Sequence, residues 1–338
     1  MNVLIVGAGA MGAALSVPLT DNGVEVTICG TEFDVGILKL LERGEKHPRI
    51  GRELEKVRIA YPDELLKEVD KHDVILLAVS TDGVTGIFDR ISDLLDHKNV
   101  ITISKGLLEI GGRILTVPEF MWDKNPYVKV VAITGPSIAR EVAARNPTRV
   151  VFSSDKIELA EKAAKLFETD YYRINPSEDI IGAEITSALK NVYSIGIAWV
   201  RGYEVRMGGI EMSNLKGVLV TMAIDETARV VVAAGGKKET VYSLSGFGDL
   251  IATFRGGRNG MLGELLGKGM GIEQALTELR KRGVGVVEGY GTARKAYRLL
   301  KEFEMGGKLK ADNFPFMRGI VDVLYRGMDV EDVLFEII

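Results

Sequence analysis

The sequence is poor in several features that mark other classes of protein. It contains a single cysteine, Cys29, so an intramolecular disulfide is excluded. No apolar run reaches the roughly 18–20 residues that a membrane-spanning helix needs. The net charge of −4 offers no basic excess for nucleic acid, and the first six residues lack the basic region of a signal peptide. We therefore expect a cytoplasmic protein that binds neither nucleic acid nor membrane.

Histidine is also scarce. The sequence has His47, His72 and His97, which form no short ligand pair such as H-x-x-x-H. We expect them to be surface or loop residues, and we expect no metal site. A metal-dependent alcohol dehydrogenase is therefore the less favoured alternative, and a chelator assay would test it.

The first half of the chain alternates short apolar runs with helical patterns. Because runs rich in Val and Ile suit strands that are covered on both faces, we predict a parallel sheet. Helical stretches at 11–21 and 83–95 separate the runs, and this alternation predicts a Rossmann-type, doubly wound α/β domain. The predicted strands lie at residues 3–6, 25–28, 74–79, 100–103, 128–133, 149–153 and 171–174.

The pattern changes after Pro176, where apolar residues recur at spacings of three and four. We place a domain boundary near residue 178, between a dinucleotide-binding domain at 1–178 and an all-helical substrate and catalytic domain at 179–338. The predicted helices of the second domain lie at residues 179–201, 214–234, 260–266, 272–282, 289–301 and 316–326.

A glycine-rich motif directly follows the first predicted strand and opens a helix. Gly7, Gly9 and Gly12 form a G-x-G-x-x-G pattern, in which the glycines allow a tight turn, close approach to a pyrophosphate and close helix packing. The helix N-terminus can bind the anion, and we expect Ala10 and Met11 to contact the cofactor as well. The alternative is a glycine turn without a ligand.

The end of the second predicted strand bears on the choice of cofactor. An acidic residue at this point binds the ribose 2′-hydroxyl of NAD, but here Thr31 comes first and Glu32 follows late. Thr31 could hydrogen-bond a 2′-phosphate, and Arg49 or Lys46 could lie nearby. We therefore expect NADP rather than NAD. The alternative is that Glu32 reaches back and selects NAD.

A predicted helix in the second half carries polar residues among apolar ones. Glu184, Ser187 and Asn191 fall on one side of it, and Lys190 lies one position away. A lysine in an apolar helix is costly unless it is used or its stem reaches to solvent. Lys190 is therefore either functional or a helix lysine whose amine reaches water.

Glycines surround a single aspartate, Asp249, and a Gly-Gly-Arg-Asn run follows it. Arg258 can hold a phosphate through two hydrogen bonds, and Asn259 and the next helix N-terminus can add more. The alternative is a charged helix start with flexible glycines. Two loops of the first half, around Lys105 and at 134–139, follow strands at their carboxyl ends, where ligands bind in open α/β sheets. Ordinary turn chemistry is the alternative for both.

Together these segments resemble the NAD(P)-dependent glycerol-3-phosphate dehydrogenases. The likeness spans nearly the whole chain, through GAGAMG, SKGL, ITGPSIAREVA, SALKNVYSI, GFGDLIATFRGGRNG and VVEGY in this order. The resemblance implies a Rossmann domain followed by a helical domain. It also implies that the substrate is a triose phosphate: dihydroxyacetone phosphate and sn-glycerol 3-phosphate are interconverted with NAD(P)H, which links glycolytic carbon to glycerophospholipid metabolism.

The resemblance implies roles for single residues. Lys190 matches the catalytic lysine, Asp249 is expected to orient it or a substrate hydroxyl, and Lys105 matches a lysine that contacts substrate and cofactor. The other substrate-binding positions are Gly135, Ser137, Asn191, Thr253, Gly257, Arg258 and Asn259. The cofactor-binding positions beyond the glycine-rich motif are Thr31, Glu32, Lys105, Ala139, Arg258, Val286 and Glu288.

Two further alternatives remain. One is a two-domain reductase that acts on a carboxylate such as ketopantoate, although the Gly-Gly-Arg-Asn run favours a phosphate. The other is a cofactor-sensing regulator without catalysis, against which Lys190, Asp249 and Arg258 argue jointly. We expect a homodimer formed through the helical domain.

Overall fold

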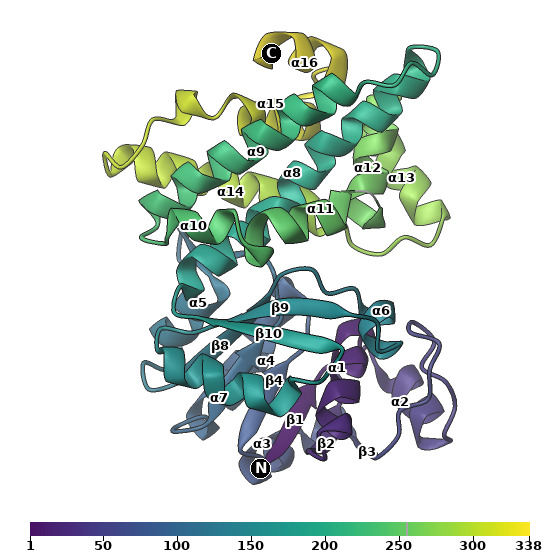
Figure 1. Ribbon diagram of the computed structural model, residues 1–338, viewed down its shortest axis with the longest axis vertical. Coiled ribbons are helices and arrows are strands. Elements are labelled where there is room, and N and C mark those ends of the chain that lie inside the picture. The colour runs from purple at the N-terminus through teal and green to yellow at the C-terminus, as the bar shows by residue number, and fades with distance from the viewer. Residues whose placement is uncertain (255) are drawn as a thin grey trace. The chain divides into compact units, whose positions relative to one another are not determined.

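A computed structural model describes residues 1–254 and 256–338. The chain forms two compact units (Figure 1). The first comprises Met1–Leu108 and Leu115–Ile180, and the second comprises Glu109–Ile114 and Ile181–Ile338. The first unit is built from strands and helices, whereas the second is mainly helical. The predicted fold class is therefore confirmed.

An eight-stranded sheet forms the centre of the first unit. Its strands are β1 (Asn2–Val6), β2 (Glu25–Cys29), β3 (Val57–Ala60), β4 (Val74–Leu77), β5 (Asn99–Thr102), β8 (Lys129–Thr134), β9 (Thr148–Ser153) and β10 (Tyr172–Ser177). Their order is β10-β9-β8-β5-β4-β1-β2-β3. Because β1 lies between β2 and β4, the chain changes its direction of winding there, and ligands bind open α/β sheets at such a switch point.

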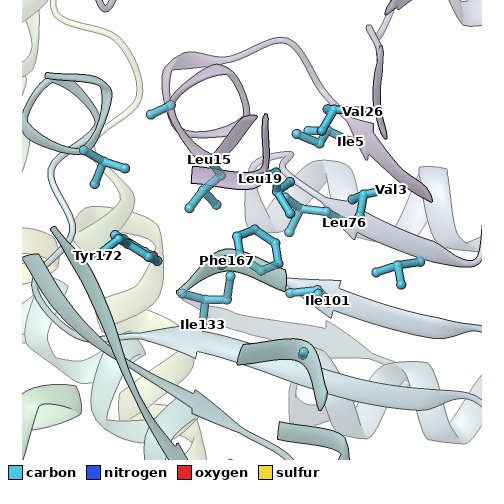
Figure 2. Packing of buried hydrophobic residues seen from close by; sticks show 14 of the residues in the cluster. Val3, Ile5, Leu15, Leu19, Val26, Leu76, Ile101, Ile133, Phe167 and Tyr172 are labelled. Atoms are coloured by element: carbon cyan, nitrogen blue, oxygen red, sulfur yellow. The ribbon is translucent and has the colours of Figure 1, made fainter. Parts of the chain in front are cut away.

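Helices and the sheet share one buried apolar cluster. Leu15, Leu19 and Phe167 come from helices and lie in this cluster with Val3 and Ile5 of β1 (Figure 2). Every residue of β4 is buried, as expected for a continuous apolar run in a sheet that is covered on both faces. The helices are α1 (Ala10–Asp21), α2 (Val35–Glu42), α3 (Leu65–Lys71), α4 (Thr81–Ile91), α5 (Val117–Lys124), α6 (Ala139–Ala143) and α7 (Ile157–Phe167).

Two features of the sheet were not predicted. Strand β9 pairs antiparallel with β8, while the other pairings of the sheet are parallel. An apolar run has the same composition in either direction, so the pattern could not reveal this. Strand β3 lies at the edge and is only partly buried, with the exposed Arg58 in its centre, so it has no apolar run.

The second unit contains α8 (Ile180–Arg206), α9 (Ser213–Ala233), α10 (Lys238–Val241), α11 (Asp249–Phe254), α12 (Gly257–Gly267), α13 (Ile272–Lys281), α14 (Glu288–Met305), α15 (Pro315–Arg326) and α16 (Val330–Ile337). Aromatic rings fill part of its core. The ring of Phe316 lies 5.5 Å from that of Tyr193 and 6.1 Å from that of Trp199. Among the described residues, no helix combines the length and apolar character needed to cross a lipid bilayer.

Helices α8 and α12 pack at very short range. A Cβ at Gly263 of α12 would overlap the carbonyl oxygen of Ile195 of α8. Only glycine allows two helix backbones to approach this closely. The contact fixes the helix that carries Lys190 against α12, which carries Arg258 and Asn259 in its first turn.

The tip of a hairpin from the first half of the chain groups with the second unit. Its strands are β6 (Leu107–Ile110) and β7 (Arg113–Thr116), and residues Glu109–Ile114 group with the helices. Arg298 of α14 forms an ion pair with Glu109 and donates a hydrogen bond to the carbonyl of Gly112. The N–H of Ile114 donates to Glu302. The hairpin was not predicted, and the boundary at residue 178 stays a prediction.

Candidate active site

The glycine-rich loop connects β1 to α1 at the switch point of the sheet. Gly7 has a φ of +108°, and a Cβ there would lie 2.7 Å from the carbonyl oxygen of Ala78. A Cβ at Gly12 would overlap the carbonyl oxygen of Gly7, so α1, which begins at Ala10, packs closely against the loop. A Cβ at Gly9 would meet no described atom within 4 Å. This open cradle, with helix N–H groups behind it, fits the pyrophosphate of a dinucleotide.

Two further predicted loops come together in the first unit. Nζ of Lys105 donates to the carbonyl oxygen of Gly135 at 3.1 Å. The hydroxyl of Ser137 lies 3.9 Å from the sulfur of Met11 in the glycine-rich motif. Ala139 begins α6, which packs against α1. The structure thus gathers these predicted residues around the N-terminus of α1.

The end of β2 is organised by an aspartate that the sequence motifs did not single out. The N–H and the hydroxyl of Thr31 donate to Oδ2 of Asp34 at 2.9 and 2.8 Å. The N–H of Ala8, in the glycine-rich loop, donates to the same oxygen. Glu32 is exposed and forms a 3.2 Å ion pair with Arg90. The hydroxyl proton of Thr31 is therefore engaged by Asp34, and the carboxylate of Glu32 is paired with a cation.

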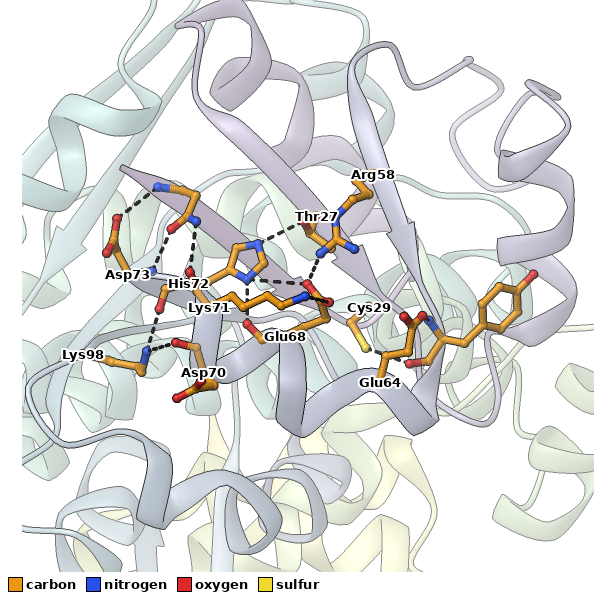
Figure 3. A network of polar contacts seen from close by, with 12 residues as sticks. Thr27, Cys29, Arg58, Glu64, Glu68, Asp70, Lys71, His72, Asp73 and Lys98 are labelled. Atoms are coloured by element: carbon orange, nitrogen blue, oxygen red, sulfur yellow. Dashed lines mark hydrogen bonds and ion pairs between the residues drawn. The ribbon is translucent and has the colours of Figure 1, made fainter.

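The three histidines were expected to be surface or loop residues, and they lie in loops, although two of them are buried. His47 is 0% exposed and His72 is 5% exposed, whereas His97 is exposed. The ring of His72 lies between the carbonyl of Glu68 and the hydroxyl of Thr27, at 2.6 and 3.0 Å (Figure 3). Burial lowers the pKa of both buried rings. Their hydrogen-bond partners are backbone groups and a hydroxyl, and Nδ1 of His72 also lies 3.8 Å from the carboxylate of Glu68, contacts that no short motif reveals.

The polar centre of the second unit is an ion pair between α8 and α11. Nζ of Lys190 lies 2.5 Å from Oδ2 of Asp249, and their side chains are 7% and 4% exposed. Lys190 also donates to the hydroxyl of Thr253 at 3.3 Å, and this hydroxyl donates to the carbonyl of Asp249 at 2.6 Å. A π-helical turn at Leu244–Gly248 immediately precedes Asp249 and delivers it to this position. The result is an ammonium group with a fixed direction.

A second chain of hydrogen bonds ties three helices together. Nδ2 of Asn259 donates to Oδ1 of Asn191 at 3.0 Å, which joins α12 to α8. Oδ1 of Asn259 accepts the N–H of Gly289 at 2.9 Å, which joins α12 to α14. Both asparagines are buried. Within residues 1–254 and 256–338, the amide of Asn259 donates one of its two N–H groups to Asn191, and the other can serve a ligand.

The predicted anion-binding residues lie at the start of α12. Gly257 is its first residue and has a φ of +81°. Arg258 is exposed, and its guanidinium forms a 3.4 Å ion pair with Glu288. Val286, in the segment before α14, is 70% exposed. The structure thus brings Arg258 and Glu288 together, and their roles toward a ligand stay predictions.

Each unit therefore contains one cluster of the predicted residues. The first unit gathers the glycine-rich loop, the end of β2 and the loops at Lys105 and Gly135. The second unit gathers Lys190, Asp249 and Thr253. Asn191, which follows Lys190 on α8, bonds Asn259 of α12 beside this cluster. Among the described residues, no group of three or more His, Cys, Asp or Glu is arranged to hold a metal ion.

Two family models and several curated relatives match this chain over nearly its whole length. The model of the NAD-dependent glycerol-3-phosphate dehydrogenase N-terminus matches residues 2–160, and that of the C-terminus matches 179–335. The NADP(+)-dependent glycerol-3-phosphate dehydrogenase of Archaeoglobus fulgidus is 56% identical over 339 residues, which cover 100% of this chain and 99% of the relative. The glycerol-3-phosphate dehydrogenase (NAD(P)+) of Bacillus subtilis is 33% identical over 337 residues, with 97% and 91% covered.

Solved structures show the same fold. The crystal structure of glycerol-3-phosphate dehydrogenase from Coxiella burnetii has a TM-score of 0.85 at 24% identity and covers 99% of this chain and 98% of its own. A ketopantoate reductase from Ralstonia eutropha has a TM-score of 0.58 at 14% identity, with 99% and 100% covered. These structures establish the fold alone, whereas the two family models and the sequence relatives go further. They show that this chain belongs to the NAD-dependent glycerol-3-phosphate dehydrogenase family.

Proposed function

We propose that this protein interconverts dihydroxyacetone phosphate and sn-glycerol 3-phosphate, and that NADP(H) is its preferred coenzyme. The buried Lys190–Asp249 pair carries the proposal, because it holds a proton donor in a unit that matches the C-terminal family model. The product would supply the glycerol phosphate from which glycerophospholipids are built.

The proposed catalytic group is Lys190. When the coenzyme is bound, its nicotinamide supplies or receives the hydride. In reduction, the ammonium of Lys190 donates a proton to the carbonyl oxygen of the substrate, and in oxidation the neutral amine accepts the hydroxyl proton. Asp249 at 2.5 Å and Thr253 at 3.3 Å restrict the direction of the amine. Such restriction lowers the entropic part of the barrier.

The proposed phosphate anchor is the start of α12. Arg258 is exposed, and among the described residues its guanidinium pairs with Glu288 alone, at 3.4 Å, which leaves donors for a phosphate. Asn259 contributes its remaining amide N–H, and Gly257 lets the backbone approach the anion. Lys105, beside Gly135, is the proposed contact to both substrate and coenzyme.

Several further contacts are proposed from the family resemblance. The proposed substrate contacts beyond those above are Gly135, Ser137, Asn191, Asp249 and Thr253. The proposed coenzyme contacts are Gly7, Gly9, Ala10, Met11, Gly12, Thr31, Glu32, Lys105, Ala139, Arg258, Val286 and Glu288.

Two observations support NADP over NAD. The relative from Archaeoglobus fulgidus, at 56% identity, is named as NADP(+)-dependent. Glu32 pairs with Arg90 at 3.2 Å, and Asp34 accepts three donors of the chain, so the negative charge of both carboxylates is partly balanced. A 2′-phosphate would then meet less charge repulsion at the end of β2.

The remaining parts of the proposal concern the organisation of the protein. We propose a dinucleotide-binding domain at 1–178, a substrate and catalytic domain at 179–338, a homodimer and a cytoplasmic location. The ranges of the two family models, 2–160 and 179–335, support the division. Light scattering on the purified protein tests the dimer.

The proposal is tested by measuring oxidation of NADPH and NADH in parallel with dihydroxyacetone phosphate. We expect turnover with both coenzymes and a higher kcat/KM with NADPH. Ketopantoate serves as the competing substrate and is expected to be inert. Turnover of ketopantoate without turnover of the triose phosphate would overturn the substrate assignment, and a higher kcat/KM with NADH would overturn the coenzyme assignment.

A further inference from the structure

Ala8 is the second residue of the glycine-rich loop, and side chains from other loops bind both of its backbone polar groups. Its N–H donates to Oδ2 of Asp34 at 3.2 Å. Its carbonyl oxygen lies 2.9 Å from Nε2 of His47. Asp34 is 8% exposed and His47 is 0% exposed. Because both groups are buried, water competes little for either hydrogen bond.

The contacts of His47 identify its donor nitrogen. Nδ1 lies 3.2 Å from the backbone nitrogen of Arg49 and accepts its proton. The ring proton is therefore on Nε2 and is donated to Ala8. Burial lowers the pKa of His47, which keeps the ring neutral with this single proton. His47 thus joins the segment before β3 to the glycine-rich loop.

Asp34 connects the same loop to the end of β2. Its Oδ2 accepts the N–H of Ala8 and also the N–H and hydroxyl of Thr31. Three donors on one oxygen fix the direction of the carboxylate and spread its charge. The glycine-rich loop, the end of β2 and the segment before β3 are therefore joined through one residue, Ala8.

The two bonds act on different peptide planes. The N–H of Ala8 belongs to the peptide that follows Gly7, and its carbonyl belongs to the peptide that precedes Gly9. Glycine tolerates many backbone angles, and Gly7 already has a φ of +108°, so both planes could otherwise rotate. One side chain holds each plane.

We propose that Asp34 and His47 are positioning residues of the coenzyme site, which hold the peptides on either side of Ala8 in the orientation that receives the coenzyme pyrophosphate. This inference rests on the proposed function. A loop that is ordered before binding loses less entropy when the ligand arrives. Because NADPH and NADH share the pyrophosphate, removing the bond from His47 weakens both coenzymes by the same factor.

The test uses the full-length protein and titrates NADPH and NADH by the change in their fluorescence. His47→Asn moves the amide to the position of Nδ1, where it no longer reaches Ala8. His47→Gln places an amide nitrogen near Nε2 and keeps the donor. We expect His47→Asn to raise both dissociation constants about tenfold, and His47→Gln to restore values close to wild type. Asp34→Ala should also raise both constants, but by unequal factors, because it releases the hydroxyl of Thr31 at the end of β2 as well.

His72→Asn is the matched control. His72 is also a buried loop histidine of the first unit, but its ring bonds Thr27 and Glu68 rather than the glycine-rich loop (Figure 3). We expect this variant to lower Tm and to leave both dissociation constants unchanged. Kinetics provide a second measurement: KM for the coenzyme rises in His47→Asn, while KM for dihydroxyacetone phosphate and kcat change little.

The outcomes separate the two proposals. Wild-type protein that binds neither coenzyme would contradict the proposed function and, with it, this inference. If the wild type binds both coenzymes, the inference alone is overturned by any of three results: His47→Asn binds as well as wild type, His47→Gln fails to restore binding, or His72→Asn weakens binding equally.

Discussion

A buried lysine is costly unless its charge is balanced, and Lys190 is only 7% exposed. Asp249 provides the balance at 2.5 Å. The carboxylate stabilises the ammonium form, and the hydroxyl of Thr253 adds a hydrogen bond. The Asp249 carboxylate therefore allows a charged Lys190 to remain buried, where it can act as the proton donor that we propose.

Replacing Lys190 with alanine is expected to lower kcat by about 100- to 10,000-fold, because the substrate oxygen loses its proton donor. Binding of NADPH should persist. Turnover and fluorescence titration measure the two effects. Lys268→Ala is the control, because Lys268 is an exposed lysine paired with Glu264. Near-normal turnover in the Lys190 variant would disprove its catalytic role.

Arg258→Ala is expected to raise KM for dihydroxyacetone phosphate by on the order of 10- to 100-fold, because charge-assisted hydrogen bonds to the phosphate are lost. The change in kcat should be smaller. Steady-state kinetics measure both values. Arg282→Ala is the matched control, since Arg282 is an exposed arginine at the end of α13 and is paired with Glu278 of that helix. An unchanged KM would contradict the phosphate assignment.

Glu226 is a buried carboxyl that predicts a pH dependence of stability. It accepts hydrogen bonds from the Tyr193 hydroxyl and from the N–H groups of Phe316 and Met317. Burial outweighs these bonds and raises its pKa from 4.5 to about 7. Because the folded state binds the proton more tightly than the unfolded state, the stabilisation is complete below about pH 4.5 and is lost as pH rises through 7.

We therefore expect the Tm of the wild type to fall between pH 5 and 8 more steeply than that of Glu226→Gln, which cannot titrate. The difference across this range should correspond to about 3 kcal/mol. Thermal unfolding followed by circular dichroism at several pH values measures it. Parallel curves for the two proteins would show that the carboxyl does not titrate in this window.

At the scale of elements, the close packing of α8 against α12 predicts a strong effect of one methyl group. Gly263→Ala places a Cβ on the carbonyl of Ile195 and should destabilise the fold by about 1–3 kcal/mol. It should also lower turnover, because α8 carries Lys190 and α12 begins beside Arg258. Thermal unfolding and steady-state kinetics measure the two effects.

The control is Gly217→Ala, an exposed glycine within α9 whose Cβ would meet no described atom within 4 Å. Because alanine favours a helix more than glycine does, this variant should be neutral or slightly more stable. Equal Tm values for Gly263→Ala and wild type would show that the two helices can separate without cost.

The elements that could be predicted are those with strong periodicity. The apolar runs at β1 and β4 and the helical spacing of α8 and α9 were recognised because burial selects their residues. Strand β3 and the β6–β7 hairpin were missed, because they are short and contain exposed charged residues such as Arg58 and Arg113. The direction of β9 was missed because hydrophobicity does not encode it.

The parts of the candidate site that could be predicted are those formed by residues close together in sequence. The glycine-rich loop and the Gly-Gly-Arg-Asn run are local patterns. The pairing of Lys190 with Asp249 joins residues that are far apart in sequence, so only the folded unit reveals its distance. Asp34 and His47 were missed because their partner, Ala8, contributes backbone atoms and leaves no trace in side-chain patterns.

At the scale of the whole molecule, the chain passes between its two units three times, after Leu108, after Ile114 and after Ile180. Only the last of these crossings lies near the predicted boundary. The units are therefore not two consecutive segments of sequence. The second unit consists of Glu109–Ile114 together with the helices that follow Ile180.

The hairpin has a consequence for anyone who truncates the gene. A fragment that starts at residue 179 would encode every helix of the second unit but omit Glu109–Ile114. Arg298 would lose the carboxylate of Glu109, and Glu302 would lose the N–H of Ile114. The fragment would expose the surface of α14 that Glu109–Ile114 covers in the full-length chain. We therefore expect the fragment to be less soluble than the full-length protein.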